Sequence, residues 1–330
     1  MSRRRFVLAL GSAAAVISFS SLAQRPATAK RIGLLTTRSK PASLEGDPGF
    51  GSYLKRMREL GYVEGQNVIS EWRFAEGKYE RVPELAKELA DSKVDVIVAM
   101  TPPSIQAAKR ATSTIPIVMV AVGDPVALGF VASFSRPGGN VTGVSNAIDD
   151  VSRKYLELLR EAMPKLSRVG ALMNPDNPNI ENIFAQIQAA GRAMGIAVSR
   201  IEANTPDRLK AGFDSMRELR PDAVIVQGDG FLFVQRQLIA DLARRARVAT
   251  LFWTREPVQA GALMSYGQNV ADDYRNAANY VDRILKGANP RDLPVEQPTQ
   301  PKLAINLKTA KALGLSIPRE LLLRADEVIQ

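Results

Sequence analysis

Residues 94–122, VDVIVAMTPPSIQAAKRATSTIPIVMVAV, decide the fold of this chain. The runs Val94–Met100 and Ile115–Val122 are rich in β-branched apolar residues, which is typical of buried strands. Between them, Ser104–Ala111 has the composition of an amphipathic helix. A strand, a helix and a second strand in this order are typical of a parallel βαβ unit. The stretch therefore predicts an α/β fold with a parallel sheet.

The same alternation of strands and helices extends from this unit in both directions. Further strands are predicted at Arg31–Thr37, Asn67–Phe74, Val141–Asn146, Val169–Asn174, Ala197–Ala203, Ala223–Gln227, Ala249–Trp253 and Leu263–Tyr266. Further helices are predicted at Tyr53–Leu60, Val82–Ala90, Ser152–Ala162, Ile180–Met194, Pro206–Leu219, Val234–Ala246 and Ala271–Lys286. With 330 residues, the chain is long enough for more than one domain. We predict two Rossmann-like α/β lobes with parallel sheets, joined by several chain crossings that form a hinge.

A weak internal echo supports the division into two lobes. Lys30–Leu35, KRIGLL, resembles Ser167–Leu172, SRVGAL, and each begins a strand that runs into a helix. Two unrelated strand starts would look similar, and this alternative stays open. We assign residues 30–147 and 268–297 to the N-terminal lobe, the second range including the helix that starts near Ala271. We assign residues 148–267 and 298–330 to the C-terminal lobe, including the segment Leu303–Leu313.

Residues 1–29 have the features of a signal peptide. Arg3, Arg4 and Arg5 precede the short apolar run Phe6–Ile17, and Ala27–Ala29 offers a small-residue cleavage site. The run is shorter than the ~20 residues that a membrane span needs, and we predict no transmembrane helix in the mature chain. The arginines also resemble a twin-arginine export signal, and an arginine-rich general secretory signal is the alternative. Either route predicts a periplasmic protein that starts at about Lys30.

The composition excludes several kinds of site. The chain has no cysteine and no histidine, which removes Cys/His zinc sites, iron–sulfur ligation, thiol nucleophiles and His-based triads. We predict no metal and no cofactor. The formal net charge of +10 falls to +6 without the four arginines of the signal peptide. The remaining basic residues are dispersed, which favours a solvated surface over a nucleic-acid partner.

Polar side chains follow the predicted strands, where an open α/β sheet binds its ligand. Hydroxyl groups and helix N-termini suit a carboxylate, and Asp124 or Asp229 could accept an ammonium group. A cap of the following helix or turn is the alternative for each acidic residue. The candidate ligand-binding residues of this kind are Thr36, Thr37, Thr101, Ser104, Asp124, Asn146, Asn174, Gln227 and Asp229.

Three aromatic residues, Phe231, Trp253 and Tyr266, fall at or just past predicted strand ends of the second lobe. Their rings could stack on an apolar ligand side chain, and packing in the core is the alternative. Enzyme motifs are weak. Gly228-Asp229-Gly230 lacks the third glycine of a dinucleotide fingerprint, and Ser52-x-x-Lys55 lacks the partner motifs of a serine–lysine site. We therefore predict no catalytic residues and no enzyme activity.

Several motifs together resemble the substrate-binding proteins of ABC transporters, the family that includes tryptophan- and tyrosine-binding receptors. The resemblance covers essentially the whole mature chain. Its motifs are ELGYVEGxN at 59–67, VDVIVA at 94–99, AAKxATxTIPIV at 107–118, GDPV at 123–126, PGGNVTG at 137–143 and INLKTAKALGL at 305–315. Met100 stands where many relatives have glycine, and Gln227–Gly230 has no clear counterpart in the family pattern.

This resemblance implies a type I periplasmic-binding fold that captures a small ligand between its lobes, an amino acid or similar compound, with aromatic amino acids among the options. It also implies delivery to an ABC permease in the inner membrane, and no catalysis. A receptor that partners a membrane sensor and an exported enzyme on the same fold are the alternatives. A repressor would need a DNA-binding helix-turn-helix where this chain has a signal peptide.

Overall fold

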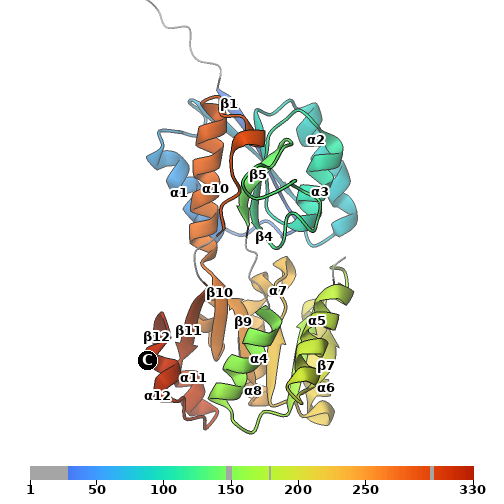
Figure 1. Cartoon of the computed structure of the whole chain (residues 1–330), viewed down its shortest axis with the longest axis vertical. Coiled ribbons are helices and arrows are strands. Elements are labelled where there is room, and N and C mark those ends of the chain that lie inside the picture. The colour runs from blue at the N-terminus through green and yellow to red at the C-terminus, as the bar shows by residue number, and fades with distance from the viewer. Residues whose placement is uncertain (1–28, 146–150, 178–179, 298–300) are drawn as a thin grey trace, which may run out of the picture.

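The structure is a computed structural model that describes residues 29–145, 151–177, 180–297 and 301–330. Residues 1–28 of the predicted signal peptide lie outside the described residues. The described chain forms two α/β lobes stacked along the long axis of the molecule (Figure 1). In none of the described ranges is a helix both long and apolar enough to cross a membrane.

The first lobe is built on a five-stranded parallel sheet in the order β2-β1-β3-β4-β5. Its strands are β1 (Lys30–Thr36), β2 (Val68–Phe74), β3 (Val96–Ala99), β4 (Ile117–Val122) and β5 (Val141–Ser145). Its helices are α1 (Pro48–Glu59), α2 (Val82–Asp91), α3 (Pro102–Ala111) and α10 (Val270–Leu285), with 3-10 turns η1 (Tyr79–Arg81) and η2 (Pro290–Asp292). Helix α10 comes late in the chain and packs beside α1.

Alternation along the strands gives the first sheet two apolar faces. On one face, Ile32 and Leu34 of β1 pack with Phe50 of α1 and with α10. On the other, Leu35 of β1 and Ile97 of β3 pack with α2 and α3. The sheet is therefore covered on both sides, as the βαβ pattern predicts.

The second lobe has a seven-stranded sheet in the order β12-β11-β10-β9-β8-β6-β7. Its strands are β6 (Arg168–Met173), β7 (Ala197–Glu202), β8 (Ala223–Val226), β9 (Ala249–Thr254), β10 (Met264–Gln268), β11 (Lys302–Asn306) and β12 (Glu327–Ile329). Its helices are α4 (Val151–Ala162), α5 (Ile180–Ala193), α6 (Pro206–Leu219), α7 (Gly230–Val234), α8 (Arg236–Ala246), α9 (Glu256–Gln259), α11 (Leu307–Ala312) and α12 (Arg319–Leu323). Strand β11 is antiparallel to β10, and the other paired strands are parallel.

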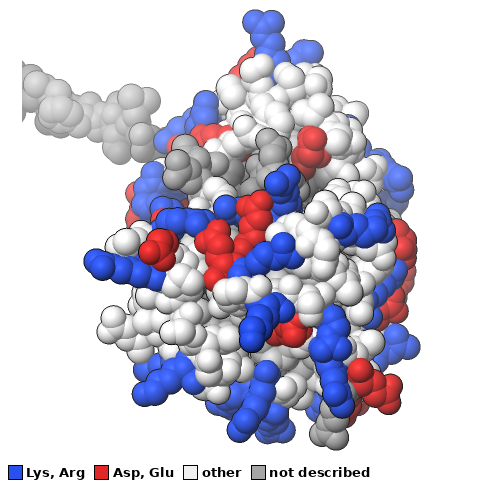
Figure 2. All heavy atoms as spheres, turned by 60° about the horizontal axis from the view of Figure 1, so that its bottom comes forward, with Lys and Arg blue, Asp and Glu red and all other residues white. Residues whose placement is uncertain are grey.

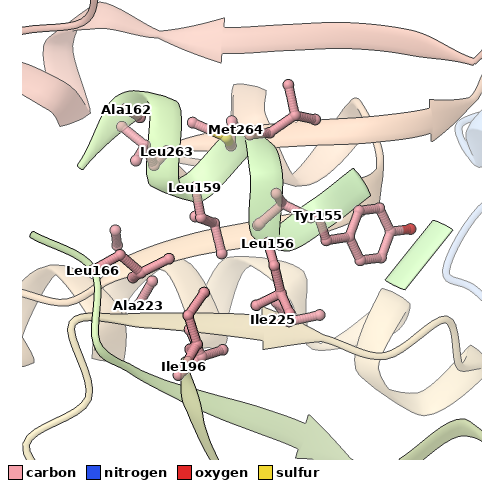
Figure 3. Packing of buried hydrophobic residues seen from close by; sticks show 14 of the residues in the cluster. Tyr155, Leu156, Leu159, Ala162, Leu166, Ile196, Ala223, Ile225, Leu263 and Met264 are labelled. Carbon is pink, nitrogen blue, oxygen red and sulfur yellow. The ribbon is translucent and has the colours of Figure 1, made fainter. Parts of the chain in front are cut away.

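The core on one face of this sheet lies under α4. Figure 3 shows Leu156 of α4 pointing toward Ile225 of β8, and Leu159 and the β10 residue Met264 belong to the same cluster. The opposite face is covered by α6, α7 and α8. The strand order 2-1-3-4-5 of the first lobe recurs as 7-6-8-9-10 in the second. The repeat explains the sequence echo between Lys30–Leu35 and Ser167–Leu172.

The chain crosses between the lobes after β5, from β10 into α10, and again after Glu296 before β11. The first and third crossings start side by side, because the Ser145 amide donates a hydrogen bond to the Glu296 carbonyl at 2.8 Å. The predicted fold class is confirmed: two α/β lobes with mainly parallel sheets.

Some predicted elements differ from the observed ones. The predicted helix Val234–Ala246 corresponds to α8, which starts two residues later, at Arg236, and the short helix α7 before it was not predicted. The segment Leu303–Leu313 contains strand β11 before helix α11. Strand β12 and the short helices α9 and α12 were not predicted, because elements of three to five residues carry too few positions to show a period.

Candidate ligand-binding cleft

The carboxyl ends of both sheets border the space between the lobes (Figure 1). The chain leaves β5 and β10 for the opposite lobe, so these strands end at the lobe boundary. Strands β1–β5 are parallel to one another, as are β6–β10. The residues that follow the strands are therefore gathered at this boundary, where ligands of α/β folds bind.

In the first lobe, four predicted residues place hydroxyl groups at this edge. Thr36 and Thr37 are fully buried. The hydroxyls of Thr101 and Ser104 lie 2.8 Å apart at the start of α3. Pro102 forms the first position of α3 and Pro103 the second, and proline has no N–H group. The start of α3 therefore offers hydroxyl groups more than backbone amides.

Asp124, the acidic candidate in the first lobe, is exposed and stabilises a turn. Its Oδ1 accepts hydrogen bonds from the backbone amides of Val126 and Ala127, each at 3.0 Å. The cap that the sequence allows is thus present, and ligand contact stays a prediction. Asn146 lies outside the described residues.

In the second lobe, three predicted residues form one buried network. The backbone amide of Asn174 donates a hydrogen bond to Gln227 Oε1 at 3.2 Å, and its side-chain Nδ2 donates one to Asp229 Oδ1 at 3.1 Å. Asp229 also accepts from the amides of Phe231 and Leu232 and so caps α7. The structure therefore brings Asn174, Gln227 and Asp229 together.

The three aromatic candidates are partly buried. Phe231 packs on the core under α6 and α8. The indole of Trp253 lies against Gly228, where an added Cβ would be 3.6 Å from the ring. Tyr266 packs on the α4 side of the sheet, where burial raises its pKa, against the lowering effect of Arg324. The structure does not bring Tyr266 together with the Asp229 network.

Contacts between the lobes were missed by the sequence analysis. The Tyr79 hydroxyl of the first lobe donates to Asp229 Oδ2 of the second at 2.7 Å. Burial is the main cause that raises the Tyr79 pKa, and the charge of Asp229 adds to it. The tyrosine therefore keeps its proton and acts as the donor. No local sequence pattern predicts a hydrogen bond between two residues that lie 150 positions apart in the chain.

Arg38 is a second contact residue that the sequence analysis missed. It is buried and pairs with Asp47, with Nη1 3.3 Å from Oδ1. Its guanidinium carbon lies 4.5 Å from the ring centroid of Phe50 in the first lobe and 5.0 Å from that of Phe233 in the second. Burial lowers the pKa of Arg38, but the hydrogen bond and charge of Asp47 outweigh it and the pKa is raised. Arg38 therefore holds a permanent positive charge between the lobes.

Unpartnered polar atoms mark the ends of three neighbouring strands of the second sheet. Gln227 Nε2, Thr254 Oγ1 and Gln268 Nε2 are buried and have no hydrogen-bond partner within the described part of the chain. Thr254 and Gln268 are aligned across β9 and β10. Buried polar groups are usually hydrogen-bonded, so these three are candidates to contact a polar ligand group.

Charged residues on the exposed face of the second lobe are mixed in sign. Figure 2 shows Lys and Arg with Asp and Glu between them. Ion pairs link its elements, as between Arg324 and Glu161 at 2.7 Å. An open groove of about 740 Å³ also lies between the lobes, beside the start of α1 and α9. Its walls carry both signs of charge: Glu45, Asp47, Lys55, Arg58, Glu59, Arg255 and Glu256.

Known proteins resemble the chain over most of its length. The family model for ABC transporter substrate binding proteins matches residues 32–329. A tyrosine-binding protein of Clostridioides difficile (strain R20291) is 27% identical over 288 residues, which cover 87% of this chain and 81% of that protein. These two matches extend through both lobes.

Solved structures resemble the chain as well. An ABC domain from Streptococcus pneumonia in complex with L-Trp is 26% identical with a TM-score of 0.80, covering 92% of this chain and 100% of that one. A ligand-free, open substrate binding protein from Clostridium difficile is 27% identical, covers 91% of this chain and 99% of that one, and has a TM-score of 0.62. By TM-score, the structure as a whole is thus more similar to the L-Trp complex than to the open protein. The chain belongs to the family of ABC transporter substrate binding proteins and has the type I periplasmic-binding fold.

Proposed function

We propose that this protein is the extracytoplasmic solute receptor of an ABC importer and that it captures an aromatic amino acid between its lobes. The observation that carries the proposal is that the strands of both lobes end in polar residues at the lobe boundary, with Thr101 and Ser104 in the first lobe and Asn174 and Gln227 in the second. A ligand that contacts both edges stabilises the closed arrangement. The tyrosine-binding relative and the L-Trp complex support the choice of ligand.

The polar groups suit the two charged ends of an amino acid. The hydroxyls of Thr101 and Ser104, at the positive end of α3, would donate to the carboxylate. Asp124 would accept from the ammonium group, because its Oδ1 caps the turn and its Oδ2 has no hydrogen bond among the described residues. Both oxygens of Asp229, in contrast, already accept from protein donors.

The apolar side chain of the ligand would lie in the second lobe. The indole of Trp253 lies beside Gly228, next to the Gln227–Asp229 segment. Aromatic rings stack with offset or edge-to-face geometry and add roughly 0.5–1.5 kcal/mol per pair. Trp253 and Phe231 are therefore the proposed stacking partners. Delivery to a permease and export by either signal-peptide route complete the proposal.

A thermal-shift screen of the mature chain from Lys30 tests this function. We expect L-tryptophan or L-tyrosine to raise the melting temperature, because a ligand that binds only the folded state stabilises it. Indole is the matched control, since it keeps the ring and lacks both charged ends. A shift with indole alone, or no shift with any amino acid, would remove amino acids as the ligand class.

A further inference from the structure

Helix α7 of the second lobe contacts the first lobe. Among the described residues, the carboxylate of its cap residue Asp229 accepts hydrogen bonds from five donors. Four belong to its own lobe: the amides of Phe231 and Leu232, Asn174 Nδ2, and Asn177 Nδ2 at 3.4 Å. The fifth is the Tyr79 hydroxyl from the other lobe. An ionised carboxylate has about four lone-pair sites, so protein donors already fill the sites at which Asp229 could accept a hydrogen bond from a ligand.

The next residue, Gly230, fits closely under the first lobe. A Cβ atom at this position would lie 2.9 Å from Arg38 Cγ and 3.4 Å from Thr37 Oγ1. Arg38 cannot easily withdraw, because Asp47 and Phe50 hold it from its own lobe. Glycine therefore lets the two lobes approach at this point.

The far end of α7 makes a third contact. The ring of Phe233 is buried, and the Arg38 guanidinium carbon lies 5.0 Å from its centroid. A buried cation over an aromatic ring is attracted by the ring electrons. A charge-assisted hydrogen bond, a close backbone approach and a cation–π contact thus lie along one turn of helix.

We propose that α7 is a closure latch: Tyr79 and Asp229, with Arg38, Gly230 and Phe233, hold the lobes together through the protein's own side chains. These are positioning residues, which set the fraction of closed molecules and need not touch the ligand. Ligand affinity rises with the fraction that is competent to bind. Tests of the latch by ligand affinity rest on the proposed function, whereas tests on the ligand-free protein do not.

The variant Tyr79→Phe removes the hydrogen bond between the lobes and keeps the ring. Tyr62→Phe is the matched control, because the Tyr62 hydroxyl donates to Asp282 Oδ1 at 3.1 Å within the first lobe. A hydrogen bond to a charged acceptor is among the stronger ones. We expect Tyr79→Phe to weaken binding of L-tryptophan or L-tyrosine about tenfold, and Tyr62→Phe to change it less than about twofold.

Hydrogen–deuterium exchange of the ligand-free proteins tests the latch even if no amino acid binds. We expect faster exchange at residues 229–235 in Tyr79→Phe and in Gly230→Ala than in Tyr62→Phe, because both variants disfavour the closed contact. Equal exchange and equal affinity in Tyr79→Phe and Tyr62→Phe would overturn the latch. So would an affinity loss in Asp229→Asn that Tyr79→Phe does not share, since Asp229 would then act on the ligand.

Discussion

Asp124 and Asp229 have the same sequence context, a carboxylate just after a buried strand, and different surroundings in the structure. Asp124 is exposed, and within the described ranges its carboxylate accepts hydrogen bonds from the amides two and three residues further on. Asp229 is buried and reaches a tyrosine 150 positions away in the chain. The first role can be predicted from neighbouring residues. The second depends on how the lobes meet, and local sequence does not contain that information.

Substitutions at Asp124 can distinguish the effect of its negative charge from the effect of its capping hydrogen bonds. Asparagine caps as well as aspartate, so Asp124→Asn should leave the melting temperature nearly unchanged, and Asp124→Ala should cost about 1 kcal/mol. If Asp124 accepts the ligand ammonium, both variants should weaken binding of L-tryptophan about tenfold or more. Isothermal titration calorimetry measures this. Unchanged affinity in Asp124→Asn would show that Asp124 caps the turn and does not bind the ligand.

Thr254 and Gln268 show why part of the site was missed. The predicted strands end at Trp253 and Tyr266, whereas β9 and β10 continue to Thr254 and Gln268. The register shifts between Ser265 and Gln268, and such an irregularity leaves little trace in the apolar pattern. Errors of one or two residues at a strand end matter here, because the ends carry the polar groups.

At the scale of elements, long periodic segments were predictable and short ones were not. The helices α2, α4 and α6 begin and end within one residue of their predicted bounds. Helix α7 has five residues and is held by contacts with the other lobe, which a local pattern cannot show. Strand β11 follows the crossing after Glu296 and pairs antiparallel with β10, outside the βαβ pattern.

Helix α10 carries a buried acid in its first turn. Burial raises the pKa of Asp273 from 3.8 to about 7, and the charges of Asp272 and Glu256 add to this. Because the folded state holds the proton more tightly than the unfolded state, stability is lost as the pH rises from about 4 through 7. The acid thus makes the folded protein less stable in neutral and alkaline solution.

Asp273→Asn should remove this loss. We expect it to raise the free energy of unfolding at pH 8 by about 1–3 kcal/mol and to have little effect at pH 4. Urea unfolding at both pH values measures the difference. Asp272→Asn, at the exposed neighbouring position, is the control and should show a smaller dependence on pH. A difference that is equal at both pH values would mean that Asp273 is not protonated in the folded protein.

At the scale of the whole molecule, the two-lobed α/β architecture follows from the alternation of strands and helices in the sequence. The relative placement of the lobes does not, because it rests on contacts such as those of Arg38 with Phe50 and Phe233. In the function that we propose, the ligand selects the closed arrangement of the lobes over an open one.

The absence of cysteine makes closure simple to measure. Glu84→Cys on α2 and Arg245→Cys on α8 place one exposed thiol on each lobe for a pair of fluorescent labels. We expect L-tryptophan to increase the energy transfer between them, because closure shortens the distance between the lobes. D-tryptophan is the control. Equal transfer with and without the ligand would show that binding does not change the arrangement of the lobes.

The late position of α10 also sets the order in which the protein can be completed on the ribosome. Phe50, Tyr53 and Met57 of α1 share their core with α10, and all the strands from β6 to β10 are synthesised before α10 emerges. The apolar face of the first sheet that α10 covers therefore stays exposed while most of the second lobe is synthesised. Exposed apolar surface on a growing chain invites aggregation. The lobe that is synthesised first can thus complete its core only after α10 has left the ribosome.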